Sequence, residues 1–297
     1  MDQRSTIVAA VDGSEESLKA LHWAVDQARA EHRSLTLLHA LGEPANPAWM
    51  DQAVLYSPEL RASVRKQGER VLDAAGREAA QRAPELEVTT ECEDADVRAA
   101  LLERSRTASL LVLGSRGRGH LRSLLLGSVS VAVVRHASCP VVVHRPTRHG
   151  VVRHGITVAV DATEESAPVL DFAYRQASLR DLPLTVLHCF WDVLASAAPA
   201  QLVTGSDHGT SAEQERLALA ETMAGMGERY PEVRVQTEVA RGMPEEVLVR
   251  LSERMDLIVV GAHQGSWARQ LLLGSRSVAV VEHASCPVAV VPVPVVT

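Results

Sequence analysis

The sequence predicts an α/β protein made of two tandem, doubly wound domains. Its 297 residues are about twice the length of an ordinary domain. The two halves repeat one another, and each half alternates aliphatic runs of strand length with segments of helical period. Only 3% of the residues are aromatic, so the cores must be aliphatic, which suits parallel strands buried on both faces.

The internal repeat defines the domains. Leu124–Val143 and Leu271–Val290 match at 17 of 20 positions with an offset of 147, and VAAVDGSEES resembles TVAVDATEES at an offset of 149. This period is too long for a solenoid repeat, so each copy should be a whole domain. Segment 144–153, HRPTRHGVVR, contains Pro146 and Gly150 and is typical of a linker. We expect one domain over 1–146 and a second over 154–297.

Each element of the first copy follows from local pattern. Ile7–Val11 is an aliphatic run that predicts a buried strand, and Ser14 is a good N-cap for the helix that follows. The other strands are expected at Leu35–Ala40, Leu86–Glu91, Leu110–Leu113 and Pro140–His144, and the other helices near Ser57–Arg82, Val97–Arg106 and Leu124–Arg135. The second copy should have strands at Ile156–Val160, Leu184–His188, Val233–Val239, Leu257–Val260 and Val288–Val291. Such alternation with right-handed crossovers gives a parallel sheet with helices on both faces.

Composition argues against several classes of protein. The formal net charge is −7 and no basic stripe is present, so we expect no nucleic-acid partner. No apolar run reaches 18 residues and no signal peptide is apparent, so we expect no membrane partner and a cytoplasmic location. The four cysteines form no Cys-x-x-Cys pair and no zinc spacing, so free thiols are expected and no metal site is predicted.

A glycine-rich stretch after the fourth strand is the clearest chemical signal. Gly114 and Gly117 follow the strand, and Gly127 and Ser128 stand where the next helix should begin. Glycines there let backbone N–H groups approach phosphate oxygens and adopt positive φ, and the helix N-terminus favours an anion. The stretch is neither a Walker A loop nor the dinucleotide fingerprint.

Side chains around this stretch fit the same chemistry. Ser128 and Ser130 could donate hydroxyl hydrogen bonds, and Arg116, Arg118 and Arg122 could neutralise phosphate charge. On spacing alone, a glycine-rich turn with solvated arginines and an ordinary helix cap is an equally good interpretation. Asp12, at the end of the first strand, could accept a hydrogen bond from an adenine amino group or a ribose hydroxyl, although helix capping is the commoner role.

Together these motifs resemble the universal stress protein family. The resemblance rests on Asp12, on Gly114-x2-Gly117-x9-Gly127-Ser128 and on the closing HASCPVVVH, and it covers nearly the whole chain as a tandem of two such domains. It implies five-stranded parallel sheets in the order 3-2-1-4-5, with ATP bound between the first and fourth strands. It also implies that Asp12 meets the adenine and that Ala40 lines the adenosine pocket. The residues implied to hold ribose and phosphates are Leu113, Gly114, Arg116, Gly117, Gly127, Ser128 and Val129.

The second copy departs from this motif. It retains Asp161, Gly261, Gly274 and Ser275, but Gln264 replaces Gly117 and Gly265 comes one residue late. His263 stands in place of Arg116, and Arg276 in place of Val129, where it could serve as a new phosphate ligand. If the Gly117 position needs positive φ, glutamine costs about 1 kcal/mol or more there. A weaker second site is predicted, and the number of nucleotides per chain stays open.

Other residues have structural roles as their simplest interpretation. His39 and His188 end the second strands and should be hydrogen-bonded structural histidines, and Cys139 and Cys286 precede prolines as buried, inert thiols. Trp49 and Trp191 follow the second strands and could cover the pocket or pack between domains.

The functional hypothesis is therefore a stress-associated regulatory or signalling module that binds ATP or a related adenine nucleotide, with or without Mg²⁺. No general base, no partnered nucleophile and no acidic pair for Mg²⁺ can be identified, so dedicated catalysis is not expected. The alternatives are a slow ATP hydrolase and an interaction module that has lost nucleotide binding in the second domain. The last strands, near Pro140–His144 and Pro287–Val291, should pair the domains within the chain, and a homodimer is expected.

Overall fold

The computed structural model describes residues 6–42, 57–117, 126–145, 151–190, 201–202, 210–263 and 274–293. It divides into two compact units, Met1–His144 and Arg145–Thr297. The division falls at the beginning of the linker segment that the sequence predicts. Trp49, Arg118, Arg122, Trp191, Gln264 and Gly265 lie outside the described residues.

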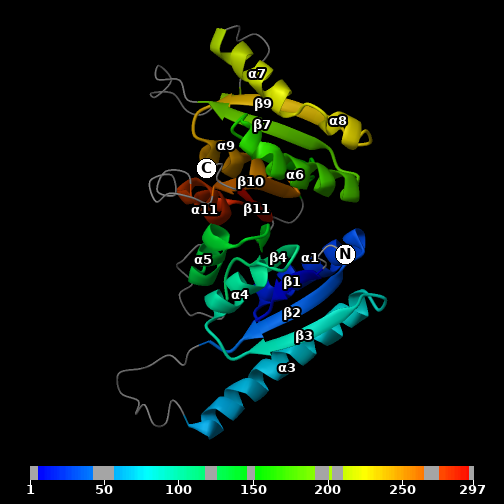
Figure 1. Ribbon diagram of the computed structural model, residues 1–297, viewed down its shortest axis with the longest axis vertical. Coiled ribbons are helices and arrows are strands. Elements are labelled where there is room, and N and C mark those ends of the chain that lie inside the picture. Colours follow the sequence, from blue (N-terminus) through cyan, green and yellow to red (C-terminus); the bar gives the residue numbers. More distant parts are fainter. Residues whose placement is uncertain are drawn as a thin grey trace. The chain divides into compact units, whose positions relative to one another are not determined.

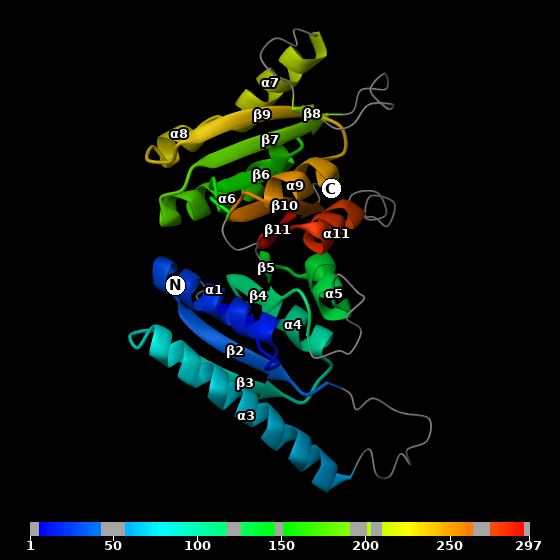
Figure 2. The ribbon, with the colours of Figure 1, turned by 180° about the vertical axis from the view of Figure 1, so that it is seen from behind.

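The first unit is a doubly wound parallel sheet (Figure 1). Its elements are β1 (Thr6–Ala10), α1 (Glu15–Glu31), β2 (Ser34–Ala40), α3 (Pro58–Arg82), β3 (Val88–Glu93), α4 (Val97–Ser105), β4 (Leu110–Gly114), α5 (Ser128–His136) and β5 (Val141–His144). The strand order β3-β2-β1-β4-β5, with every pair parallel, confirms the predicted order. Helix α1 packs beside α3 and helix α4 beside α5, one pair on each face of the sheet (Figure 2).

Helix α1 shows how the sequence sets these elements. Ser14 is its N-cap and accepts a hydrogen bond from the Ser17 N–H at 3.2 Å, and Glu15 and Glu16 in the first turn favour the positive end of the helix. The helix ends at Glu31, and its C-cap residue His32 adopts the left-handed conformation at φ 52°. Its buried stripe of small and aliphatic side chains packs on the sheet because these positions recur at helical spacing.

Several strand boundaries differ from prediction: in the second unit β9 (Val235–Arg241) begins two residues later than Val233, and in the first unit β3 is shifted. Strand β3 begins at Val88, two residues later than the apolar pattern indicates. Leu86 belongs to the turn after α3 instead, since its N–H donates to the Ala83 carbonyl at 3.1 Å. The first ladder pair of β2 with β3 is then Leu35 with Val88.

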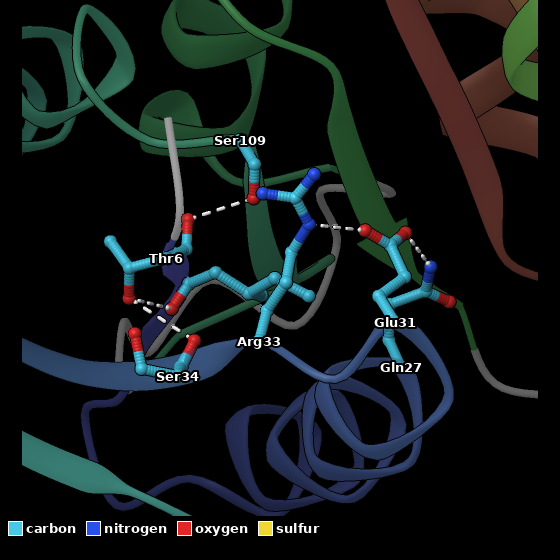
Figure 3. Close-up of polar contacts among 7 residues, drawn as sticks. Thr6, Gln27, Glu31, Arg33, Ser34 and Ser109 are labelled. Carbon is cyan, nitrogen blue, oxygen red and sulfur yellow. Dashed lines mark hydrogen bonds and ion pairs between the residues drawn. The ribbon is translucent and has the colours of Figure 1, made fainter. Parts of the chain in front are cut away.

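The amino-terminal ends of the strands in the first unit are joined by polar side chains (Figure 3). The Ser109 hydroxyl donates to the Thr6 carbonyl at 2.8 Å, and the Thr6 hydroxyl donates to the Ser34 carbonyl at 3.1 Å. Nearby, Arg33 Nε lies 2.9 Å from Oε2 of Glu31, and the other carboxylate oxygen of Glu31, Oε1, accepts from the Gln27 side-chain amide. These contacts hold together the amino-terminal ends of the strands, which lie opposite the carboxyl-terminal ends.

The second unit repeats the plan with additions. Its elements are β6 (Ile156–Val160), the 3-10 helix η1 (Glu164–Ser166), α6 (Ala167–Arg180), β7 (Leu184–Phe190), β8 (Gln201–Leu202), α7 (Thr210–Thr222), α8 (Met226–Arg229), β9 (Val235–Arg241), α9 (Pro244–Ser252), β10 (Leu257–His263), α11 (Gly274–His283) and β11 (Val288–Val293). Five parallel strands follow the order β9-β7-β6-β10-β11, as predicted.

Two features of the second unit were not predicted. The short strand β8 adds to the edge of the sheet and pairs antiparallel with β9, through Gln201 with Arg241 and Leu202 with Ala240. Strand β10 runs on to His263, where it pairs with Val293 of β11, whereas β4 stops at Gly114. The fourth strand of the second unit therefore stays paired in the sheet for two more residues than the fourth strand of the first unit.

Candidate functional site

A cavity of about 670 Å³ opens at the carboxyl-terminal ends of β1 and β4 in the first unit. The strand order reverses between these two strands, which is where ligands bind in open α/β sheets. Ten of the first-domain residues singled out from the sequence line this cavity: Asp12, Ala40, Leu113, Gly114, Arg116, Gly117, Gly127, Ser128, Val129 and Ser130. The structure thus brings together three segments that lie far apart in the chain.

Asp12 lies just after the carboxyl-terminal end of β1, where hydrogen bonds fix its side chain. Its Oδ1 accepts the backbone N–H of Ser14 at 2.9 Å and the Ser14 hydroxyl at 2.6 Å, which forms a tight turn ahead of α1. Its Oδ2 lies against Gly117, because a β-carbon on Gly117 would fall 2.7 Å from it. The Asp12 carboxylate therefore connects the loop after β1 with the loop after β4.

The glycines of the motif are needed for close approach, and the expectation of positive φ is wrong for Gly114, Gly117 and Gly127. Within the described residues, the glycines at positive φ are Gly13, Gly42, Gly155, Gly225 and Gly242. A β-carbon on Gly114 would lie 2.9 Å from the backbone carbon of Glu16 and 3.1 Å from the Ser17 nitrogen. Gly114 therefore lets the end of β4 touch the first turn of α1, a contact that backbone atoms cannot relax away from.

The amino terminus of α5 borders the cavity. Gly127 is its N-cap and supplies no side-chain hydrogen bond, so the first N–H groups of the helix are not capped by a side chain at that position. Ser128 is exposed at the start of the helix. Ser130 is not the donor that the sequence indicates, because its buried hydroxyl donates to the Gly114 carbonyl at 3.0 Å. That bond holds the helix start against the end of β4.

Sequence reasoning missed the apolar wall of the cavity. Val97 and Leu101 of α4 and Leu126 before α5 complete the lining. Val97 and Leu101 stand four residues apart in a predicted helix, so they share one face, but nothing local indicates which strand end that face covers. His39 also lines the cavity, and its Nδ1 donates to the Val11 carbonyl at 2.6 Å, as a structural histidine would.

Glu16 is a further residue of the lining that the sequence did not single out as a ligand. Its Oε1 lies 3.5 Å from the Lys19 ammonium. Its Oε2 is buried and has no hydrogen-bond partner in the described part of the chain. Within that part, no group of three or more His, Cys, Asp or Glu side chains is placed to hold a metal ion.

The corresponding cavity of the second unit is much smaller, at about 160 Å³. Asp161, Gly261 and Arg276 line it. Asp161 Oδ1 accepts from the Thr163 hydroxyl at 2.7 Å and from the Ser166 hydroxyl at 2.5 Å, which repeats the turn made by Asp12. His263 ends β10, and Gly274 and Ser275 begin α11.

The family model described as the universal stress protein family matches residues 3–145 and 153–292. The chain belongs to the universal stress protein family. The match falls once on each copy of the repeat, so both halves are universal stress protein domains, as the sequence motifs predict. Among the described residues, no helix is long and apolar enough to cross a membrane.

Full-length relatives have the same tandem length. A universal stress protein of Mycolicibacterium smegmatis is 32% identical over 292 residues and covers 96% of each chain. A universal stress protein of Mycobacterium tuberculosis is 32% identical over 291 residues, 96% of this chain and 95% of the relative. The crystal structure of a universal stress protein from Archaeoglobus fulgidus aligns with a TM-score of 0.71 at 18% identity, over 98% of this chain and 97% of that one, and supports the fold.

Proposed function

We propose that this universal stress protein binds ATP, or a closely related adenine nucleotide, in the cavity of its first unit and acts as a stress-associated regulatory module. The observation that carries the proposal is the convergence of Asp12, the glycine-rich loop and the α5 amino terminus on one cavity. Its volume of about 670 Å³ lies within the range of about 300–1,000 Å³ that is usual for small-molecule sites.

The two ends of the cavity suit the two ends of a nucleotide. Ala40, Val97 and Leu101 offer small and aliphatic surface for the adenosine. Helix α5 begins at a glycine N-cap that makes no side-chain hydrogen bond, and the helix dipole and the first backbone N–H groups of such a helix favour phosphate. Arg116 lines the same cavity and is exposed, so its guanidinium is available for charge-assisted hydrogen bonds to phosphate oxygens.

Binding without dedicated catalysis fits the titratable groups of the lining. Asp12 Oδ1 is engaged by Ser14, and His39 Nδ1 is engaged by a backbone carbonyl. Glu16 is the carboxylate whose Oε2 has no bond among the described residues, so it is the residue to test for Mg²⁺ binding or slow hydrolysis. When Mg²⁺ accompanies ATP, it would neutralise phosphate charge.

Calorimetric titration with ATP tests the proposal on the full chain. Wild type should bind ATP, and Arg116→Gln should weaken binding by about tenfold or more, since hydrogen bonds to charged groups contribute about 1.5–3 kcal/mol. Arg106→Gln, which removes an exposed arginine that pairs with Glu103 on α4, is the matched control and should bind like wild type. Gly117→Gln copies the second domain's residue and should also weaken binding, because its β-carbon displaces the Asp12 carboxylate.

The same samples separate the alternatives. Absence of binding to wild type at millimolar ATP would contradict the nucleotide proposal and favour an interaction module. Release of phosphate with Mg²⁺, lost on Glu16→Gln, would favour a slow ATP hydrolase.

A further inference from the structure

We infer that the chain carries a single nucleotide site, because in the second unit Glu245 and Cys189 close the adenosine end of the equivalent cavity. This inference rests on the proposed function of the first unit. It differs from the sequence-based explanation, which attributes a weaker second site to the loss of Gly117 in the phosphate loop.

The repeat fixes which residues correspond. Cys189 follows His188 as Ala40 follows His39, and both histidines donate to the carbonyl at the end of the first strand of their unit, Val160 or Val11. Pro244 and Glu245 begin α9 as Val97 and Arg98 begin α4, at an offset of 147. The Ser285 N–H donates to Ser252 at 2.9 Å, and the Ser138 N–H donates to Ser105 at the same distance, which confirms this alignment.

Arg98 and Glu245 point to different places. In the first unit, Asp96 is the N-cap of α4 and binds the Arg98 guanidinium, so that side chain lies 55% exposed, away from the cavity. In the second unit, Met243 holds the N-cap position and offers no carboxylate. Glu245 instead lines the cavity, with its Oε2 buried and without a bond among the described residues.

Cys189 and Glu245 are neighbours in that cavity. Burial, together with the nearby Glu245 carboxylate, raises the pKa of the Cys189 thiol to about 12. The thiol is therefore neutral at physiological pH and occupies space that the smaller Ala40 leaves open in the first unit. A carboxylate at this place also removes the apolar character that suits an adenine ring.

Two valines also line the second cavity, Val169 and Val293. Val169 takes the position of Ala20, and its Cγ2 lies 3.2 Å from where a β-carbon on Gly261 would be. Val293, on the extended part of β11, lies at the same distance from that point. Because β10 stays paired with β11 as far as His263, residues 262–263 do not turn away as 115–117 do in the first unit. The resulting volume of about 160 Å³ is below the usual range of about 300–1,000 Å³ for ligand sites.

ATP stoichiometry of the full chain, measured by calorimetry, tests the inference. Wild type should bind about one ATP per chain, and the double variant Cys189→Ala/Glu245→Ala should bind about two, because the adenosine end of the second cavity is opened. Cys189→Ala/Glu246→Ala is the matched control, since Glu246 is the exposed acidic neighbour in the same helical turn, and it should still bind one. Gln264→Gly, which restores only the phosphate-loop glycine, should also bind one.

The outcomes separate this inference from the function on which it rests. Two sites in wild type, or a second site gained by Gln264→Gly alone, would overturn it. The double variant Cys189→Ala/Glu245→Ala could also overturn it. This would be the result if the variant still binds ATP at its first site, which shows that it is folded, but gains no second site. If wild type binds no ATP, the proposed function itself fails, whereas two ATP per chain in wild type would leave the proposed function standing and overturn only this inference.

Discussion

The Nε2 atom of His188 lies 3.0 Å from the Oε2 atom of Glu215, and this contact attaches α7 to strand β7. His188 is buried, and its Nδ1 donates to the Val160 carbonyl, so both ring nitrogens have oxygen partners. In the first unit, Gly68 of α3 stands at the position of Glu215 and packs directly on His39. In the second unit, the Glu215 carboxylate fills the space beside the histidine. In the first unit, the glycine lets the helix backbone pack directly on the histidine.

Removing the Glu215 carboxylate should destabilise the protein. Glu215→Ala leaves a buried ring nitrogen of His188 without its partner, and an unsatisfied buried polar group costs about 1–3 kcal/mol. The unfolding free energy from urea titration, monitored by circular dichroism, measures the effect. Glu213→Ala is the matched control, because Glu213 is mostly exposed and its one ion pair among the described residues is with Arg216 on the same helix, so its removal should cost no more than about 0.5 kcal/mol. Equal effects of the two variants would contradict the role of the buried contact.

Two glycines of the same helix should respond in opposite directions to alanine. A β-carbon on Gly68 would lie 2.7 Å from His39 Cδ2 and 2.8 Å from Leu41 Cδ2, so Gly68→Ala should overpack the interface and destabilise by about 1–3 kcal/mol. At Gly76 the nearest atom is Thr90 Cγ2 at 3.9 Å, so Gly76→Ala should stabilise by about 0.5–1 kcal/mol through helix propensity. Melting temperatures of the two variants would test this, and a stabilising Gly68→Ala would show that the helix can move away from His39.

These examples show what the sequence could and could not predict. The bounds of strands such as Ile156–Val160 were predicted to the residue, because a short run of aliphatic side chains is typical of a strand buried on both faces of a parallel sheet. Asp12 and the Gly114 motif could be named because they follow strand ends, which meet at one end of a parallel sheet, whereas Ala40, Leu113 and Val129 were named from the family resemblance. Both signals are local in sequence.

What could not be predicted depends on contacts between distant segments. The need for glycine at Gly114 comes from the backbone of Glu16, nearly a hundred positions away, so its conformation was inferred wrongly from the residue type alone. The directions of Arg98 and Glu245 depend on whether the N-cap residue offers a carboxylate, a choice that becomes visible only when both helix starts are compared in three dimensions. Strand β8 is two residues long, too short for any periodicity.

The N-cap of α4 should give a pH-dependent contribution to stability. Asp96 accepts from the backbone N–H groups of Arg98 and Ala99. The hydrogen bond from the Arg98 side chain, and after it the bonds from these N–H groups, lower the pKa of the Asp96 carboxyl below its ordinary value. A carboxyl whose folded-state pKa is lowered stabilises the fold above the unfolded-state pKa and loses that contribution as pH falls through the folded value. Asp96→Ala should therefore cost about 1 kcal/mol at neutral pH, and the difference from wild type should shrink in acid.

Urea titrations of wild type and Asp96→Ala at pH 7 and near pH 3 check this. Asp96→Asn is the control, because asparagine caps a helix about as well but carries no charge, so its stability difference from wild type should stay small at pH 7. A cost of Asp96→Ala that is the same at both pH values would show that the cap acts through hydrogen bonding alone.

The thiols of Cys189 and Cys286 should resist alkylation in the folded protein. Burial raises the pKa of each to about 12, with the Glu245 carboxylate contributing at Cys189. At pH 8 only about one thiol in ten thousand would then be ionised, and the thiolate is the reacting form. Labelling with iodoacetamide, read by mass spectrometry of peptides, should leave both unmodified in the native protein, whereas all four cysteines should react in urea. Glu245→Gln keeps the side-chain size but removes the charge, so it should speed labelling of Cys189 and leave Cys286 unchanged. If the variant labels both cysteines faster, general loosening of the unit would be the cause, and the local effect of the Glu245 charge on Cys189 would be contradicted.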